Sequence, residues 1–252
     1  MDIKVMSFNM RVPSDKDGKN HFTNRESNIL SVIQSEDADL IGFQEATDYS
    51  RKFLRDNISG KYTVIGCGRE SNFRGESCCI AFKNDKFELV KYETKFLSHT
   101  PDVSGSIYSG TDQSRCPRLY IHAELACEDG KIIHFYNTHL DHIGATARFL
   151  GMTQIMQSVS ECVGRFVLTG DMNALPDSPE IRLPLLCKQK RIVDVTAGIE
   201  NTFHSYGRKT SNHKIDYIFT DAECKNAYAV EDSHENGIYI SDHYPVCSIL
   251  KI

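Results

Sequence analysis

Polar side chains of a few chemical kinds recur along this sequence where apolar segments of strand length end. They are carboxylates, amides and imidazoles, and in chain order they are Asn9, Glu45, His139, Asp171 with Asn173, Asp216, and Asp242 with His243. Strand ends in α/β folds share a sheet edge, so residues distant in sequence can converge there. Carboxylate and amide oxygens suit a hard cation, which favours Mg²⁺, with Mn²⁺ as the alternative, over zinc. Two histidines beside that cation suit binding or protonation of a phosphate ester.

Each of these residues has a structural alternative when it is taken alone. Asp171 and Asn173 could form an Asx turn ahead of a helix. Asp216 could cap the start of a strand, and His243 could be a hydrogen-bonded histidine at a strand mouth. The recurrence of the whole set outweighs these explanations, because all of them would have to hold together.

Six short motifs carry these residues through the chain. They are Ser7-Phe8-Asn9, Gly42-Phe43-Gln44-Glu45, Asn137-Thr138-His139-Leu140, Gly170-Asp171-Met172-Asn173, Ile215-Asp216-Tyr217-Ile218-Phe219 and Ser241-Asp242-His243-Tyr244-Pro245. Any one of them is weak evidence, but in this order they resemble the signature of the endonuclease/exonuclease/phosphatase superfamily. That superfamily includes pancreatic-type deoxyribonucleases, abasic-site endonucleases, deadenylases and nocturnin, inositol polyphosphate 5-phosphatases and neutral sphingomyelinases. Asp141-His142 extends the third motif in a way that is similar to bacterial relatives.

The resemblance implies a fold and a metal site. The fold would be a four-layer α/β sandwich, in which two packed mixed β-sheets are flanked by helices. Glu45 would bind the essential Mg²⁺, with Asn9 and Asp242 close by.

The resemblance also implies catalytic roles. Asp171 would align or deprotonate the attacking water and would be held by Asn173. His243, oriented by Asp216, would contact the scissile phosphate and share in proton transfer. These roles agree with elementary chemistry: an aspartate beside a cation stays ionised, and a histidine braced by a carboxylate keeps one tautomer.

His139 matches the second histidine of the deoxyribonuclease branch, a position at which abasic-site enzymes differ. That branch pairs its histidine with a glutamate on an earlier strand. Glu76, which precedes a predicted strand at 78–83, is the natural candidate for this partner.

Three further residues are candidates for substrate contact, namely His142, Arg148 and Arg118. Asp141 next to His142 could instead cap a helix, since acidic residues favour helix N-termini. Arg118 could pair with surface carboxylates. Arg25 is expected on the surface of a helix.

Other polar groups are expected to be structural. His204, His213 and His234 are expected on the surface. A Met and Phe stripe over 149–156 is expected to lie in the core.

The elements that must position these residues follow from periodicity and turn signals. Strands are expected at 3–8, 40–44, three times within 62–92, at about 118–127, 131–138, 166–169, 214–220 and 244–250. Helices are expected at about 23–36, opened by a Thr23-Asn24-Arg25-Glu26 capping box, at 47–58, at 145–163 and from 178 onward. Residues 98–117 form a long loop. No repeat or linker occurs in 1–252, which predicts one domain.

Composition narrows the partners and the compartment. The net charge of −5 gives no large basic footprint for duplex nucleic acid, and tryptophan is absent, so base stacking would depend on Tyr or Phe. Nine cysteines without a CxxC pair predict a reduced, cytoplasmic chain and no tetrahedral zinc site. The sequence shows no secretory signal or membrane span, so a membrane partner is not expected.

The function that these features favour is a Mg²⁺-dependent phosphodiesterase or nuclease that acts by in-line attack of water. The alternative is a phosphomonoesterase for a small nucleotide or sugar phosphate. A non-catalytic binding module on the same fold is a more remote alternative. The partner is a phosphate-ester substrate, which includes nucleic acid or a nucleotide, and the oligomeric state stays open.

Overall fold

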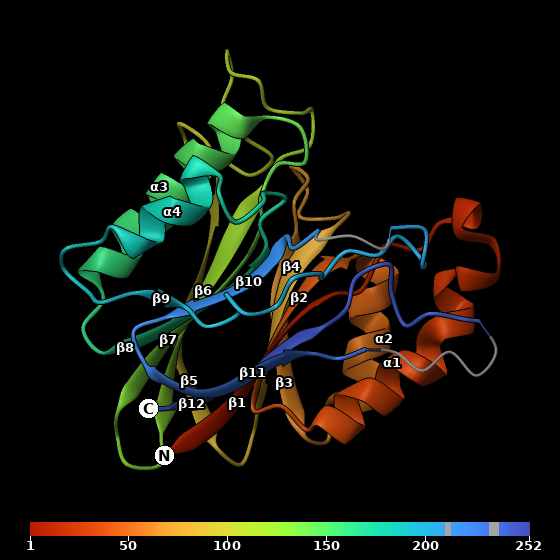
Figure 1. Ribbon diagram of the computed structural model, residues 1–252, viewed down its shortest axis with the longest axis horizontal. Helices are drawn as coiled ribbons and strands as arrows, with labels where there is room; N and C mark the ends of the chain where they lie inside the picture. Colours follow the sequence, from red (N-terminus) through yellow and green to blue (C-terminus); the bar gives the residue numbers. More distant parts are fainter. Residues whose placement is uncertain (210–212, 232–236) are drawn as a thin grey trace.

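Two mixed β-sheets lie face to face between two pairs of helices in the computed structural model, which describes residues 1–209, 213–231 and 237–252 (Figure 1). The first sheet has the order β11 (Glu223–Ala229), β12 (Val246–Lys251), β1 (Asp2–Asn9), β2 (Leu40–Ala46), β4 (Ser77–Lys83) and β3 (Tyr62–Gly68). The second has the order β5 (Phe87–Phe96), β6 (Leu119–Cys127), β7 (Ile132–His139), β8 (Arg165–Asp171), β10 (Asp216–Thr220) and β9 (Val193–Asp194). The predicted four-layer sandwich is confirmed.

The helices cover the outer faces of the two sheets. They are α1 (Phe22–Glu36), α2 (Asp48–Ile58), α3 (Ala145–Glu161) and α4 (Pro179–Leu185), and a 3₁₀ helix, η1 (Asp15–Asn20), precedes α1. Figure 1 shows α1 and α2 against the first sheet and α3 and α4 against the second. No described helix is both long enough and apolar enough to cross a membrane.

Three buried apolar layers hold the four structural layers together, as alternation along the strands requires. Side chains such as Val5, Ile121 and Phe135 form the layer between the sheets. A second layer lies under α1 and α2, and a third lies under α3 and α4, where Tyr136 and Met152 are buried.

Strand direction and register bring the polar strand ends to one edge. β1 and β2 are parallel, and so are β7 and β8, which places His139 beside Asp171. β10 runs antiparallel to β8, so its first residue, Asp216, lies opposite Asp171. Residues from distant parts of the chain therefore meet at one end of the space between the sheets.

The start of α1 differs from the prediction. The helix begins at Phe22, and His21 is its N-cap, whose ring accepts from the Thr23 amide, so the predicted capping box is wrong. Arg25 is fully buried, not on the surface, and its guanidinium donates to the backbone carbonyls of Met10 and Ile240. A buried guanidinium needs such acceptors, and here it fastens α1 to two loops.

The remaining differences concern weakly patterned segments. β9, β11 and η1 were not predicted, because β9 has two residues and β11 is a polar, half-exposed edge strand. The stripe on α3 is buried at Met152 and Met156, but Phe149 is 39% exposed and Val163 lies beyond the helix end, so the Phe part of that prediction is wrong. The other predicted elements and the loop at 98–117 are confirmed.

Candidate active site

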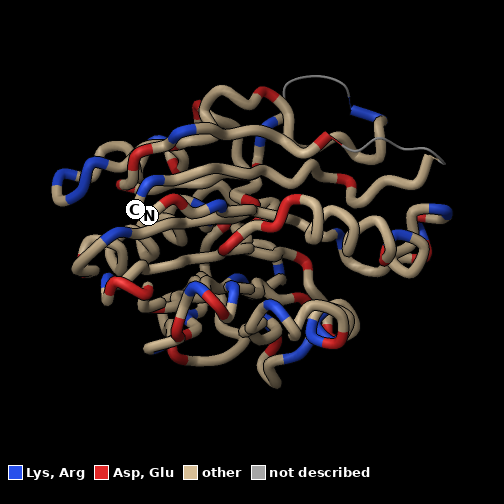
Figure 2. Tube along the Cα trace, turned by 90° about the horizontal axis from the view of Figure 1, so that it is seen from below, with Lys and Arg blue, Asp and Glu red and all other residues tan. Residues whose placement is uncertain are grey.

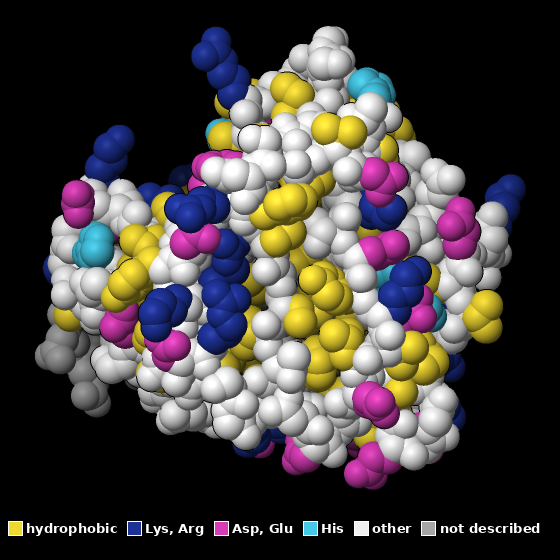
Figure 3. Space-filling model, turned by 180° about the vertical axis from the view of Figure 1, so that it is seen from behind, with side chains coloured by type: hydrophobic (Ala, Val, Ile, Leu, Met, Phe, Trp, Pro, Cys, Tyr) yellow, Lys and Arg dark blue, Asp and Glu magenta, His cyan; other side chains and the backbone are white. Residues whose placement is uncertain are grey.

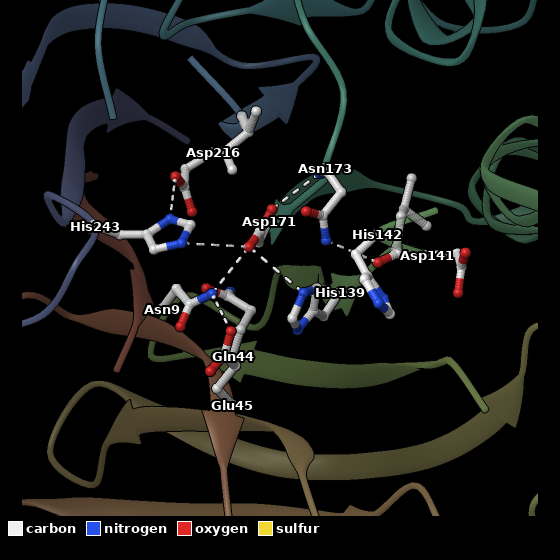
Figure 4. A network of polar contacts seen from close by, with 12 residues as sticks. Asn9, Gln44, Glu45, His139, Asp141, His142, Asp171, Asn173, Asp216 and His243 are labelled. Carbon is white, nitrogen blue, oxygen red and sulfur yellow. Dashed lines mark hydrogen bonds and ion pairs between the residues drawn. The ribbon is translucent and has the colours of Figure 1, made fainter. Parts of the chain in front are cut away.

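A cleft of about 510 Å³ opens at the edge where the polar strand ends meet. Its walls include Glu45, His139, Asp171, Asp242 and His243, contributed by both sheets and by the loop before β12. Figure 4 shows that most of the predicted catalytic side chains point toward one another there. The cleft volume lies in the range of small-molecule sites, about 300–1,000 Å³.

Asp171 lies at the centre of the cluster and is 2% exposed. Its Oδ1 accepts from the Asn173 amide at 2.9 Å, and its Oδ2 accepts from Asn9 Nδ2 at 2.9 Å. The same Oδ2 lies 3.5 Å from His139 Nε2 and 3.8 Å from His243 Nε2 (Figure 4). Burial, together with the charge of Asp216, raises the pKa of Asp171 to about 7. A carboxyl group with such a pKa can exchange a proton near neutral pH.

His243 and Asp216 form a hydrogen-bonded pair, with 2.8 Å between Nδ1 and Oδ2. Burial alone would lower the pKa of His243, but the carboxylates of Asp216, Asp171 and Asp242 outweigh it and raise this pKa to about 10. The imidazolium is therefore fixed with Nδ1 on Asp216 and Nε2 directed at Asp171, so it can donate a proton into the cleft.

Glu45 reaches the cleft because the backbone of β2 departs from regular alternation. Gln44 points between the sheets and donates to Asn137 Oδ1 at 2.7 Å, so a regular strand would turn Glu45 to the opposite face. The pairing of β2 with β4 is irregular after Phe43, and Glu45 has a φ of 59°. A positive φ is unfavourable for glutamate, and its occurrence here fits a side chain that is held for function.

A divalent cation fits the oxygen donors on this side of the cleft. Glu45 Oε2 and Asp242 Oδ2 lie 3.9 Å and 3.8 Å from the Arg11 guanidinium, so two carboxylates already face one positive group. Asn9 donates to Glu45 Oε1 at 3.1 Å and to Asp171, while its Oδ1 accepts from the Arg11 amide. In this orientation the Asn9 amide positions the carboxylates of Glu45 and Asp171. Hard oxygen donors of this kind suit Mg²⁺ or Mn²⁺.

The predicted pairing of Glu76 with His139 is not seen among the described residues. Both side chains line the cleft, but Glu76 Oε1 accepts from Arg69 Nη2 at 2.8 Å. Arg69 follows β3 directly and forms an ion pair with Glu76, which was predicted to pair with His139. Burial, with the nearby charge of Arg118, holds the pKa of His139 well below the ordinary histidine value. His139 is therefore neutral.

Arg118 and His142 form the wall beyond His139. Arg118 is 5% exposed, and its Nη2 lies 3.0 Å from Nδ1 of His142. Arg118 Nε has no hydrogen-bond partner among the residues that the structure describes. Burial lowers the pKa of Arg118, but a guanidinium still remains charged at neutral pH. This Nε is enclosed and lies 3.9 Å from Asp141 Oδ2, so Arg118 offers the cleft its positive charge, which suits an anion.

The structure places Arg148 outside the cleft. Its Nε donates to Glu180 at 2.6 Å, and its Nη1 donates to the Asp141 carbonyl. Asp141 accepts from the amides of Ile143 and Gly144, which precede α3, whereas Asp112 accepts from the first-turn amides of Thr146 and Ala147, so the helix-capping alternative for Asp141 is wrong. Arg148 thus joins α3 to α4, and the contact with substrate that was predicted for it has no geometric support.

Several cleft residues were missed in the sequence. They are Arg11, Val12, Arg69, Cys116, Phe203, Lys209, His213 and Ile215. Arg11 and Arg69 each follow a strand within two residues, and this position is the signal that could have identified them. The surface prediction is wrong for His204, which is buried and stacked on Tyr244 with 4.1 Å between ring centroids, whereas His213 is half-buried and lines the cleft. His234 lies outside the described residues.

Close contact between the sheets explains the glycine of the second motif. Asn137 donates to the backbone carbonyls of Phe43 and Cys79 at 2.8 Å each, which ties the sheets together behind the cleft. A Cβ at Gly42 would lie 2.1 Å from Thr169 Oγ1 and 2.6 Å from Asn137 Oδ1. Only glycine fits there, so this motif residue serves the approach of the sheets.

Comparisons with known proteins agree with this fold. The model of the Endonuclease/Exonuclease/phosphatase family matches residues 6–243. An uncharacterized protein, L388, of Acanthamoeba polyphaga mimivirus is 25% identical over 247 residues, which cover 90% of this chain and 91% of that protein.

Solved structures of similar proteins extend over the whole chain. An endonuclease/exonuclease/phosphatase from Bacteroides vulgatus has a TM-score of 0.92 and 28% identity, with 100% of this chain and 99% of that chain covered. A mannosyl-6-phosphatase of Bacteroides thetaiotaomicron has a TM-score of 0.85 and 25% identity, with 99% of this chain and 100% of that chain covered.

Proposed function

Because this chain belongs to the endonuclease/exonuclease/phosphatase family of phosphoric ester hydrolases, we propose that it is a divalent-metal-dependent phosphomonoesterase for a small sugar phosphate. The observation that carries the proposal is the wall beyond His139, where the buried guanidinium of Arg118 lines the cleft beside Arg69 and His142. The sequence alone favoured a phosphodiesterase or nuclease and kept the monoesterase as its alternative.

The composition of the cleft wall favours a small, hydroxyl-rich substrate. Phe203 is the only Phe, Tyr or Trp among the lining residues of the described chain, so a series of bases would find little aromatic surface to stack on. Arginine, glutamate and histidine side chains instead offer donors and acceptors to hydroxyl groups. The likeness to a mannosyl-6-phosphatase over nearly the whole chain supports the same class of substrate.

The charge in the cleft supports a monoester over a diester. A terminal phosphate carries about −1.5 to −2 charges at pH 7, whereas a diester carries one. Arg11, Arg69, Arg118 and Lys209 line the cleft, and His243 adds a fifth positive group because its pKa is raised to about 10. Four acidic residues, Glu45, Glu76, Asp171 and Asp242, line the same cleft, so a bound divalent cation would supply the net positive charge that suits the dianion.

Charge elsewhere on the molecule gives little support to binding of long nucleic acids. Acidic and basic residues alternate along the chain in Figure 2. On the face shown in Figure 3, some Lys and Arg side chains form a group and others are spread over the face, with acidic side chains among them. Affinity for duplex DNA depends on a row of phosphate contacts, which this face does not offer.

The mechanism divides between two sets of side chains. Asp171 Oδ2 orients the attacking water and accepts its proton, while Asn9 and Asn173 hold the carboxylate in place. His243 Nε2 contacts the phosphate and donates a proton, with its orientation fixed by Asp216. When bound, a divalent cation neutralises charge on the phosphoryl oxygens and assists the leaving oxygen.

Arg118 and Arg115 provide a matched test, because both are arginines near the end of one loop and only Arg118 lines the cleft. Turnover by the wild type, Arg118→Gln and Arg115→Gln would be measured on hexose 6-phosphates, nucleoside monophosphates, a chromogenic diester, DNA and RNA, with Mg²⁺ or EDTA. We expect a hexose phosphate to be preferred and Arg118→Gln to weaken its binding about 10-fold or more, as loss of a charged hydrogen bond implies. Arg115→Gln should match the wild type. Faster turnover of diesters or nucleic acid than of every monoester would overturn the proposal.

A further inference from the structure

A second cavity, of about 410 Å³, lies on the other side of the second sheet, beside the C-terminal end of α3. Its lining includes His122 from β6, His134 from β7 and Cys162, which follows α3 directly. One ligand atom from each of these residues lies within 4.8 Å of the others. None of them lines the catalytic cleft.

Each histidine uses one ring nitrogen for a contact with a neighbouring residue, and its other ring nitrogen faces the other histidine. His134 Nε2 donates to the carbonyl of Val163 at 3.0 Å. His122 Nδ1 lies 3.4 Å from Glu93 Oε1. The remaining nitrogens, His122 Nε2 and His134 Nδ1, are 2.9 Å apart. A backbone carbonyl and a carboxylate on the far nitrogens are the partners that orient metal-binding histidines in proteins.

Tyr136 contacts both His122 and Cys162. Its ring stacks on the His122 ring with 4.2 Å between centroids and 2° between planes. Its hydroxyl lies 2.8 Å from Cys162 Sγ, and the thiol donates to the Ser158 carbonyl at 3.3 Å. Burial raises the pKa of this thiol, and the Tyr136 hydroxyl opposes that shift, so a metal would bind Cys162 by displacing its proton.

Glu124 can complete a set of four ligands. It lies directly opposite His134 in the pairing of β6 with β7, and it is two residues from His122, on the same face of β6. It also lines the cavity. Side chains directly opposite each other in an antiparallel pair have Cβ atoms only about 4.5–5.5 Å apart, so a carboxylate there can reach the histidines.

We infer that His122, His134 and Cys162 form a zinc site, with Glu124 as the fourth ligand. Two imidazoles and a thiolate suit Zn²⁺ and do not suit Mg²⁺, which prefers oxygen. Bonds of about 2.0–2.3 Å place the ligand atoms of a tetrahedral zinc roughly 3.3–3.6 Å apart. The two nitrogens therefore move apart by a few tenths of an ångström from their present 2.9 Å, and the sulfur closes in. The ion would join the end of α3 to β6 and β7.

Cobalt(II) is the probe for this site, because only a thiolate ligand gives the sulfur-to-cobalt charge-transfer band. Metal-free, reduced protein would be titrated with Co²⁺ as wild type, Cys162→Ser, Cys187→Ser and Glu45→Gln. Cys187 is the matched control, since it is also half-buried and lies outside the cavity. Glu45→Gln separates this site from the catalytic cleft, because it removes a carboxylate that would hold the metal there. We expect the band in all proteins except Cys162→Ser, and we expect Zn²⁺ to abolish it by displacement.

Two further measurements keep the inference open to refutation if Cys162→Ser folds poorly. Glu93→Gln should weaken zinc binding about 10–100-fold, as loss of a partner behind a ligand does. Zinc should raise the melting temperature of Glu45→Gln and leave that of the double variant Glu45→Gln/Cys162→Ser unchanged. No charge-transfer band in the wild type, or an undiminished band in Cys162→Ser, would overturn the site. The two histidines would then share a proton and no metal.

Discussion

The catalytic cleft and the cavity beside α3 are built on opposite faces of the same sheet, and β7 contributes to both. His139, at the end of β7, lies among the carboxylates between the sheets, whereas His134 faces the layer under α3. The two histidines are five residues apart, so alternation along the strand sends them to opposite faces. One strand thus serves an oxygen-rich site and a nitrogen- and sulfur-rich site that differ in the metal they suit.

The two sites also differ in the part of the backbone that carries their side chains. The cleft gathers its groups at strand ends and in loops, where backbone departures such as that at Glu45 can direct side chains into solvent. The second cluster takes its histidines from the middle of β6 and β7, where hydrogen bonding on both sides fixes the backbone. We therefore expect changes in the cleft to affect turnover and changes in the cavity to affect stability.

The largest effect is expected at His243. His243→Ala removes the imidazolium that Asp216 orients, so turnover should fall about 10²–10⁴-fold while the fold persists. Steady-state kinetics and the melting temperature would be measured together. His99→Ala, on an exposed loop, is the control, and a folded His243→Ala protein with near-normal turnover would refute the role.

A smaller effect is expected on metal binding at Glu45. Glu45→Gln keeps the shape of the side chain and removes one of the two carboxylates that face Arg11, so Mg²⁺ affinity should fall at least about 10-fold. Calorimetric titration of Mg²⁺ measures this directly, with the exposed Glu70→Gln as control. Unchanged affinity in Glu45→Gln would place the cation elsewhere.

The pH dependence of turnover should move when Asp216 loses its charge. Asp171 must be ionised to accept a proton and has a pKa of about 7, so activity should fall below that pH. His243 must be protonated to donate and has a pKa of about 10, so activity should also fall above that pH. Asp216 raises both values, so Asp216→Asn should shift both limbs of the pH profile downward by about one unit. Turnover of the wild type and Asp216→Asn would be measured across pH at one saturating Mg²⁺ concentration. A pH profile with both limbs at the same pH in the two proteins would contradict this prediction.

The smallest effect on catalysis is expected from the other face of the sheet. Cys162→Ser should leave kcat and KM unchanged, because Cys162 contacts Tyr136 and Ser158 and does not line the cleft. The same assay with Cys187→Ser is the control. A loss of turnover in folded Cys162→Ser would mean that the two regions are coupled.

Six ordered motifs and the family resemblance that they carry were sufficient to select the residues of the catalytic cluster. Asn9 and Asp171 end β1 and β8, Asp216 begins β10, and the strand register then brings them together. The pairing of Glu76 could not be predicted in this way, because Arg69 on the neighbouring strand end competes for that carboxylate.

The second cluster shows the limit of such patterns. The absence of a zinc motif was inferred from local spacing, yet His122, His134 and Cys162 meet only through the pairing of β6 with β7 and the packing of α3. Arg25 was placed on the surface for a similar reason: a charge on a helix reveals nothing about the carbonyl groups that distant loops bring to it.

The most direct test of the catalytic proposal is release of inorganic phosphate from a hexose phosphate by Asp171→Asn at saturating Mg²⁺. The variant replaces the buried carboxylate on which Asn9, His139 and His243 converge, and calorimetry would confirm that it still binds the metal. The exposed Asp177→Asn, a few residues along the chain, is the matched control. We predict a loss of about 10²–10⁴-fold in Asp171→Asn and none in Asp177→Asn. A folded, Mg²⁺-loaded Asp171→Asn that releases phosphate at the wild-type rate would contradict the proposed chemistry.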